Sequence, residues 1–90
     1  MTYVTCEVSD GLRAAEATVG VRNYNGRMEY LPIHRGMLAR SNGKDLLPVH
    51  LIHWDEARGA ALVGLPDEAD SGASRLWVHL ADLESLELAS

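Results

Sequence analysis

Hydrophobic and polar residues alternate with a period of two along several short runs of the chain. In "TYVTCEV" (residues 2–8) and "RLWVHL" (residues 75–80), every second residue is apolar. Successive side chains of a β-strand point to opposite faces, so this period is typical of strands with one buried face. The predicted inward positions are Val4, Cys6, Val8, Leu76, Val78 and Leu80.

A first hairpin is predicted at the dipeptide Asn25-Gly26. Both residue types tolerate a positive φ, which a two-residue hairpin turn requires. Such a turn pairs Arg22 with Glu29 and Val21 with Tyr30. The same register therefore brings together opposite charges on one face and apolar side chains on the other.

A second hairpin is predicted at Asn42-Gly43, by the same turn chemistry. Its register places Arg40 opposite Asp45 and Leu38 opposite Leu47. The pairing again joins opposite charges and apolar side chains, which supports the assignment.

A third hairpin is predicted between "LPVHLIHW" and "AALVGLP", with the loop Asp55–Gly59. A five-residue loop pairs Leu51 with Val63 on one face and Ile52 with Leu62 on the other. Because both faces carry apolar residues, we expect this hairpin to lie centrally in the sheet.

Helical signals are few. The segment Leu12–Ala17 contains good helix formers but is too short to be stable alone. A helical turn is expected at Ala81–Leu83, before a last strand. Another is expected after Pro66, where the acidic residues of "DEADSG" (residues 67–72) suit the positive end of a helix and Gly72 suits its left-handed exit.

These elements together predict an all-β protein: a small antiparallel barrel of five to seven short strands, formed by residues 1–90 as one domain. Ninety residues suffice for one hydrophobic core. We expect no secretory leader, because residues 1–10 lack both a basic start and an apolar run. No apolar run of the chain approaches the roughly 18–20 residues that span a bilayer. With Cys6 as the only cysteine, no internal disulfide forms, and we expect a cytoplasmic protein without membrane contact.

Charge is unevenly distributed along the chain, whose net charge is -5. Between residues 13 and 44, six basic residues face two acidic ones. Between residues 55 and 90, eight acidic residues face two basic ones. Such asymmetry indicates either a polar partner surface or charges that interleave on the folded surface.

Catalytic and metal-binding patterns are weak. His50 and His53 are three residues apart, a spacing that places them on opposite faces of a strand, and no ligand motif accompanies them. The "DEADSG" loop lacks the glutamate at position 12 of a calcium loop. Ser74, His79 and Asp82 have the residue types of a hydrolase triad, but no nucleophile elbow is present. We therefore expect a non-catalytic protein without metal or cofactor.

Two tryptophans are the strongest candidates for a binding surface. Trp54 and Trp77 both alternate away from the predicted core face. If exposed together, they form an apolar patch of the kind that binds a protein partner, with Arg75 and His79 at its rim. Alternatively, they pack with Ile52 and Leu62 as a second small core.

The function predicted from these residues is a protein-binding or assembly module, whose partner is another protein or a second copy of the chain. The alternative is RNA binding through a basic side. The acidic net charge disfavours this alternative. The basic candidates are Arg22, Arg27, Arg35, Arg40 and Lys44.

The segment "GKDLLPVHLIHWDEARGAALV" (residues 43–63) resembles the core of PRC-barrel domains. These are SH3-like small barrels, found as a module of a reaction-centre subunit and in ribosome-maturation proteins. The resemblance covers about a quarter of the chain and implies an SH3-like barrel, but it carries over no functional residue. "LPDEADSGASRLWV" (residues 65–78) also resembles a stretch of small uncharacterised bacterial proteins.

Overall fold

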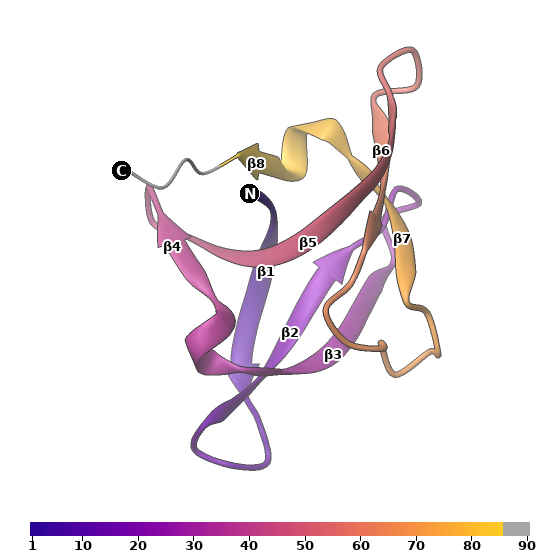
Figure 1. Ribbon diagram of the computed structural model, residues 1–90. Coiled ribbons are helices and arrows are strands. Elements are labelled where there is room, and N and C mark those ends of the chain that lie inside the picture. Colours follow the sequence, from indigo (N-terminus) through magenta and orange to yellow (C-terminus); the bar gives the residue numbers. More distant parts are fainter. Residues whose placement is uncertain (86–90) are drawn as a thin grey trace.

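The computed structural model describes residues 1–85 and consists of eight short strands and two single 3₁₀ turns (Figure 1). The strands are β1 (Thr2–Asp10), β2 (Glu16–Arg22), β3 (Met28–His34), β4 (Ala39–Ser41), β5 (Lys44–Asp55), β6 (Ala60–Gly64), β7 (Arg75–His79) and β8 (Leu83–Ser85). The 3₁₀ turns are η1 (Arg35–Met37) and η2 (Leu80–Asp82). The all-β prediction is confirmed, with one strand more than the predicted maximum.

All strand pairs are antiparallel and follow the order β3-β2-β1-β5-β6-β7, while β4 pairs with β5 and β8 pairs with β1. The sheet curls into a half-barrel (Figure 1). Two backbone hydrogen bonds from loops connect its ends. The Tyr24 N–H donates to the Trp77 carbonyl on β7 at 2.6 Å, and the Asp70 N–H donates to the Tyr30 carbonyl on β3 at 2.8 Å. Loops thus satisfy part of the edges that the open sheet leaves unpaired.

The core fills the concave side of the sheet, and its residues come from the alternating positions of nearly every long strand. The predicted inward residues Val4, Leu76 and Val78 are buried, and Cys6 and Val8 pack against the core from partly exposed positions. β-branched residues predominate, which suits a pleated surface packed on one side. The fully buried side chains at the centre are Val4, Val19, Val21, Leu31, Leu47, Val63 and Val78.

The hairpin at Asn42-Gly43 has the predicted register. Both turn residues have positive φ, 53° and 77°, and Arg40 lies opposite Asp45 with 3.9 Å between Nη1 and Oδ1. The expected pair of Leu38 with Leu47 falls outside the ladder, because β4 begins at Ala39. Leu38 instead packs against the core from outside the strand.

The predicted register at Asn25-Gly26 is wrong by one residue. Arg22 pairs with Met28 and Val21 pairs with Glu29. The cause is the Asn23 side chain, whose Oδ1 accepts hydrogen bonds from the N–H groups of Asn25 and Arg27, both at 3.0 Å. This local side-chain bonding produces a longer turn in which Gly26 has positive φ and Asn25 does not.

The β5–β6 hairpin keeps the predicted pair of Leu51 with Val63, but a β-bulge follows. Ile52 is the extra residue, so Leu62 lies opposite His53 instead of the predicted Ile52. The bulge shifts the register by one, and every later residue of β5 therefore points to the opposite face from that expected.

Neither the helix-forming residues of Leu12–Ala17, which were predicted to be too few for a stable helix, nor the turn expected after Pro66 gives a helix. Leu12–Ala17 leads instead into β2, where Ala17 is completely buried, so tertiary burial overrides local helix propensity. No helical turn follows Pro66; the loop crosses from β6 to β7 and bonds to β3, although Gly72 has the expected positive φ of 91°. The turn expected at Ala81–Leu83 is confirmed as η2, and β8 follows it.

Candidate functional site

The two tryptophans lie on opposite faces of the sheet. Residues directly opposite each other in a ladder share a face. Trp54 lies in the row of Ala61 and Val78, which are fully buried on the core side, whereas Trp77 lies in the outer row of His53 and Leu62. The bulge at Ile52 is the cause, since without it Trp54 would share the face of Trp77. The predicted patch with both rings side by side is therefore not present, and neither is the alternative small core.

Trp54 belongs to an exposed apolar surface of β5. Its side chain is 50% exposed, although it points to the core side, because it stands near the hairpin tip beyond the rest of the barrel (Figure 1). Leu51 and Ile52 are exposed to 39% and 42%. Leu51 shares the core-side face with Trp54, whereas the Ile52 side chain lies beside Gly64 and His50 on the outer face. Leu51, Ile52 and Trp54, together with Met37 at 44%, define the β5 apolar surface, which spans both faces of the strand.

A groove of about 550 Å³ adjoins this surface. No Asp, Glu, Lys or Arg side chain lines it among the residues that the structure describes. Its apolar lining residues are Met1, Met37, Pro48, Val49, Leu51, Leu65 and Pro66. The groove extends the β5 apolar surface past the bulge toward the loop that follows β6.

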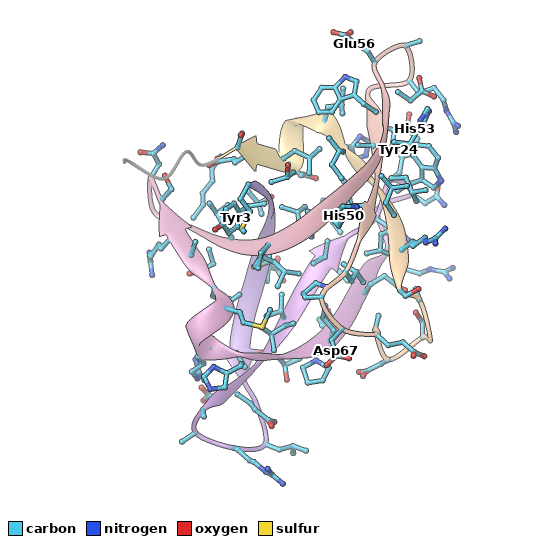
Figure 2. The ribbon with its side chains drawn as sticks, viewed as in Figure 1. Tyr3, Tyr24, His50, His53, Glu56 and Asp67 are labelled. Atoms are coloured by element: carbon cyan, nitrogen blue, oxygen red, sulfur yellow. The ribbon has the colours of Figure 1, made fainter. Side chains whose placement is uncertain are left out.

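Trp77, in contrast, is engaged by neighbours within the protein. The Arg58 guanidinium lies 5.6 Å from the centre of its ring, and the His53 ring meets it edge-on at 6.0 Å. Tyr24 stacks on His79 at 4.5 Å between ring centres and donates its hydroxyl to the Arg58 carbonyl at 3.0 Å. Figure 2 shows Tyr24 and His53 close together at this side of the molecule. These five residues form the Trp77 cluster.

The predicted rim residues lie beside the Trp77 cluster and away from Trp54. Arg75, two residues before Trp77 in the sequence, shares the outer face of β7 with it and is exposed. His79 is half-buried against Tyr24. Three of the four predicted protein-binding residues are therefore brought together, and Trp54 belongs to a different surface. Tyr24 and Arg58 joined the site only through the tertiary structure, since nothing in their sequence spacing links them to Trp77.

The five predicted basic residues do not form one basic side. Three of them have acidic partners: Arg35 with Asp10 at 2.9 Å, Arg40 with Asp45, and Lys44 with Glu84 at 3.6 Å. Arg27 lies in the β2–β3 turn, and Arg22 faces a groove that also contains carboxylates. Their charges are dispersed and largely paired, which fits the interleaved surface that was one of the two expectations.

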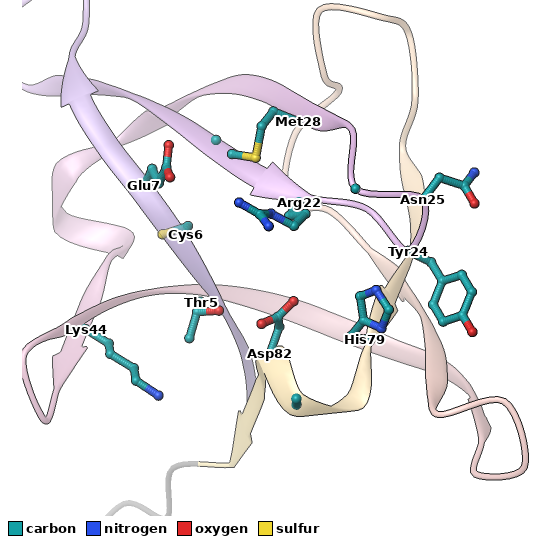
Figure 3. A pocket seen from close by; sticks show the side chains of 13 residues that line it. Thr5, Cys6, Glu7, Arg22, Tyr24, Asn25, Met28, Lys44, His79 and Asp82 are labelled. Carbon is teal, nitrogen blue, oxygen red and sulfur yellow. The ribbon is translucent and has the colours of Figure 1, made fainter.

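That groove, of about 840 Å³, opens between β1, β2 and η2 (Figure 3). Arg22 and Lys44 contribute positive charge, while Glu7 and Asp82 contribute negative charge. Cys6 lies at its wall, where burial, followed by the nearby carboxylate of Asp45, raises the pKa of the thiol to about 12. A thiol with this pKa is protonated at neutral pH and is a poor nucleophile.

Other catalytic arrangements receive no support from the geometry. No hydrogen bond joins Ser74, His79 and Asp82 in the described part of the chain, although His79 and Asp82 both line the groove of Figure 3. Within residues 1–85, no group of three His, Cys, Asp or Glu side chains is arranged to hold a metal ion. The predicted placement of His50 and His53 on opposite faces of the strand is wrong. His50 lies opposite Gly64 and His53 opposite Leu62, two residues apart on β6, so the bulge between them puts both histidines on the outer face.

No family model, curated protein or solved structure matches the chain. The resemblance to PRC-barrel and SH3-like domains therefore stays a prediction from the sequence. None of the secondary-structure elements in residues 1–85 is a helix with the length and apolar character that a membrane crossing needs.

Proposed function

We propose that this protein is a non-catalytic protein-binding or assembly module that contacts its partner through the β5 apolar surface. The observation that carries the proposal is the exposure of Leu51, Ile52 and Trp54 within four consecutive residues of one strand. Large apolar side chains gathered in this way on a small domain are typical of interaction sites, and tryptophan is enriched at their energetic centres.

The shape of the hairpin supports this proposal. The tip of the β5–β6 hairpin extends beyond the rest of the barrel (Figure 1), and Trp54 on its core side and Ile52 on its outer face are both exposed. The apolar groove beside Leu51 offers space for a side chain of the partner. A protruding apolar strand next to such a groove suits an apolar segment of another protein or of a second copy.

Two competing functions are less well supported. RNA binding through the predicted basic side would require a continuous row of free cations, whereas three of the five are paired with carboxylates. Catalysis through Cys6 would require a thiolate, and its pKa of about 12 keeps the thiol protonated at neutral pH.

Sedimentation velocity over a range of protein concentrations tests self-association, and Trp54→Ala tests the surface. We expect the substitution to weaken self-association by about 30-fold, the effect of about 2 kcal/mol that interface tryptophans typically contribute. Leu12→Ser is the matched control, because Leu12 is fully exposed in a loop away from the β5 apolar surface.

If the wild-type chain stays monomeric, a photo-cross-linking residue at position 52 identifies a partner, which is then purified and titrated against the variants. The proposal requires a complex that Trp54→Ala weakens and Leu12→Ser leaves unchanged. The proposal is contradicted if both variants form an equally strong complex. It is also contradicted if neither sedimentation nor cross-linking detects a complex.

A further inference from the structure

A small pocket of about 230 Å³ lies on the outer side of the Trp77 cluster. None of its lining residues belongs to the β5 apolar surface. Its lining residues are Asn23, Tyr24, Asn25, Arg58, Arg75, Leu76 and Trp77. The set contains two arginines, two asparagines and two aromatic residues, but no carboxylate.

The two arginines are available for an external anion. Within the described residues, neither Arg58 nor Arg75 forms an ion pair, whereas Arg35, Arg40 and Lys44 each have an acidic partner. Asp55, three residues before Arg58, accepts a hydrogen bond from the Arg58 backbone N–H at 3.2 Å. A locally positive pocket thus persists in a chain whose net charge is -5.

The elements that carry these residues are held in place before any ligand binds. The Tyr24 hydroxyl donates to the Arg58 carbonyl at 3.0 Å and its N–H donates to the Trp77 carbonyl at 2.6 Å. Arg75 is on β7, whose pairing with β6 fixes its backbone opposite Gly64. The Arg58 guanidinium already rests near the rings of Trp77 and Tyr24, at 5.6 and 5.9 Å. Such ordering lowers the entropy that binding would otherwise lose.

We propose that this pocket binds a phosphate monoester through Arg58 and Arg75. The planar guanidinium groups match the oxygen geometry of phosphate and bind it with two parallel hydrogen bonds each. The side-chain amides of Asn23 and Asn25 add donors at the wall of the pocket. The volume corresponds to about eight water molecules at ~30 Å³ each, which exceeds inorganic phosphate and leaves room for its substituent.

The larger groove of Figure 3 does not identify a ligand in the same way. Its two cations face two carboxylates, so neither an anion nor a cation is favoured by the charges. The Arg58–Arg75 pocket has a single sign of charge, and this determines the ligand class that it selects.

Titration of free phosphoserine into the Trp54→Phe variant tests the proposal, because Trp77 is then the only tryptophan and reports on its own pocket. We expect a saturable change in its fluorescence. Arg58→Ala and Arg75→Ala should each weaken binding about tenfold or more, since hydrogen bonds to charged groups contribute strongly. Arg13→Ala is the control, because Arg13 is exposed, has no ion pair in residues 1–85, and lies outside the pocket.

Further titrations distinguish the source of the phosphate. Phosphoserine binding as tightly as a phosphoserine peptide assigns the pocket to a small phosphorylated metabolite, and tighter binding of the peptide assigns it to a phosphorylated protein. An unphosphorylated peptide and a short single-stranded RNA are titrated in the same way for comparison. The proposal is overturned if phosphoserine gives no saturable change, if Arg13→Ala weakens binding as much as the pocket variants, or if only the RNA binds.

Discussion

Trp54 and Trp77 are the same residue type on neighbouring parts of one sheet, yet they have different roles. Trp77 is held between Arg58 and His53 and helps to join the β5–β6 hairpin and the β2–β3 turn to β7. Trp54 is half-exposed near the tip of the hairpin. The comparison teaches that a tryptophan in a strand pattern acquires its role from the face and the neighbours that the sheet gives it. Its place in the hydrophobic pattern does not determine that role.

One residue accounts for this difference. Before the bulge, β5 and β6 pair as the sequence predicts, and after Ile52 the pairing is shifted. In the predicted register, Trp54 would point to the outer face with Trp77. The bulge turns it to the core side, where the barrel ends too soon to cover it, and so produces the exposed apolar surface.

The largest expected difference is in folding stability. Trp77→Ala should lower the free energy of unfolding by about 3 kcal/mol, since it removes a half-buried ring and its contacts with Arg58 and His53. Trp54→Ala should lower it by less than ~1 kcal/mol, because the ring is already half-exposed. Urea unfolding of both variants measures this, and equal losses would mean that the two rings are not in different environments.

An intermediate effect is expected from the turn that carries Tyr24. Gly26→Val should cost about 1–3 kcal/mol, because Gly26 has φ 86° and a β-branched residue is strained there. Gly43→Val is the matched control, with φ 77° and equally open space around the added Cβ. Both should lower stability in urea, but only Gly26→Val should shift the emission of Trp77. A shift with Gly43→Val as well would show that the signal reports general loosening.

The smallest effect is expected from Tyr24→Phe, which removes one hydrogen bond to the Arg58 carbonyl. We expect a loss of about 1 kcal/mol and easier acrylamide quenching of Trp77, with quenching of Trp54 unchanged. Trp54→Phe and Trp77→Phe backgrounds separate the two signals. Unchanged quenching of Trp77 would show that this hydrogen bond does not order the Trp77 cluster.

The sequence predicted the strands and the core with fair success. Alternation identified Val4, Leu76 and Val78 as buried, and the Asn42-Gly43 turn gave the correct pairing of Arg40 with Asp45. These features depend on local rules, namely the period of two and the φ preferences of asparagine and glycine. The Asn25-Gly26 turn has the same dipeptide but a different register, because Asn23 supplies a competing hydrogen-bond acceptor.

The sequence by itself therefore determined an all-β chain, its core positions and the residue types available for binding. Only the tertiary structure decided which of those residues meet. It brought Tyr24 and Arg58, which lie 53 and 19 residues before Trp77 in the sequence, to the Trp77 ring, and it separated Trp54 from them. The physical reason is that side-chain direction in a strand reverses with each residue, so one bulge changes the face of every later residue in that strand. The pattern of hydrophobic residues does not reveal where a bulge occurs.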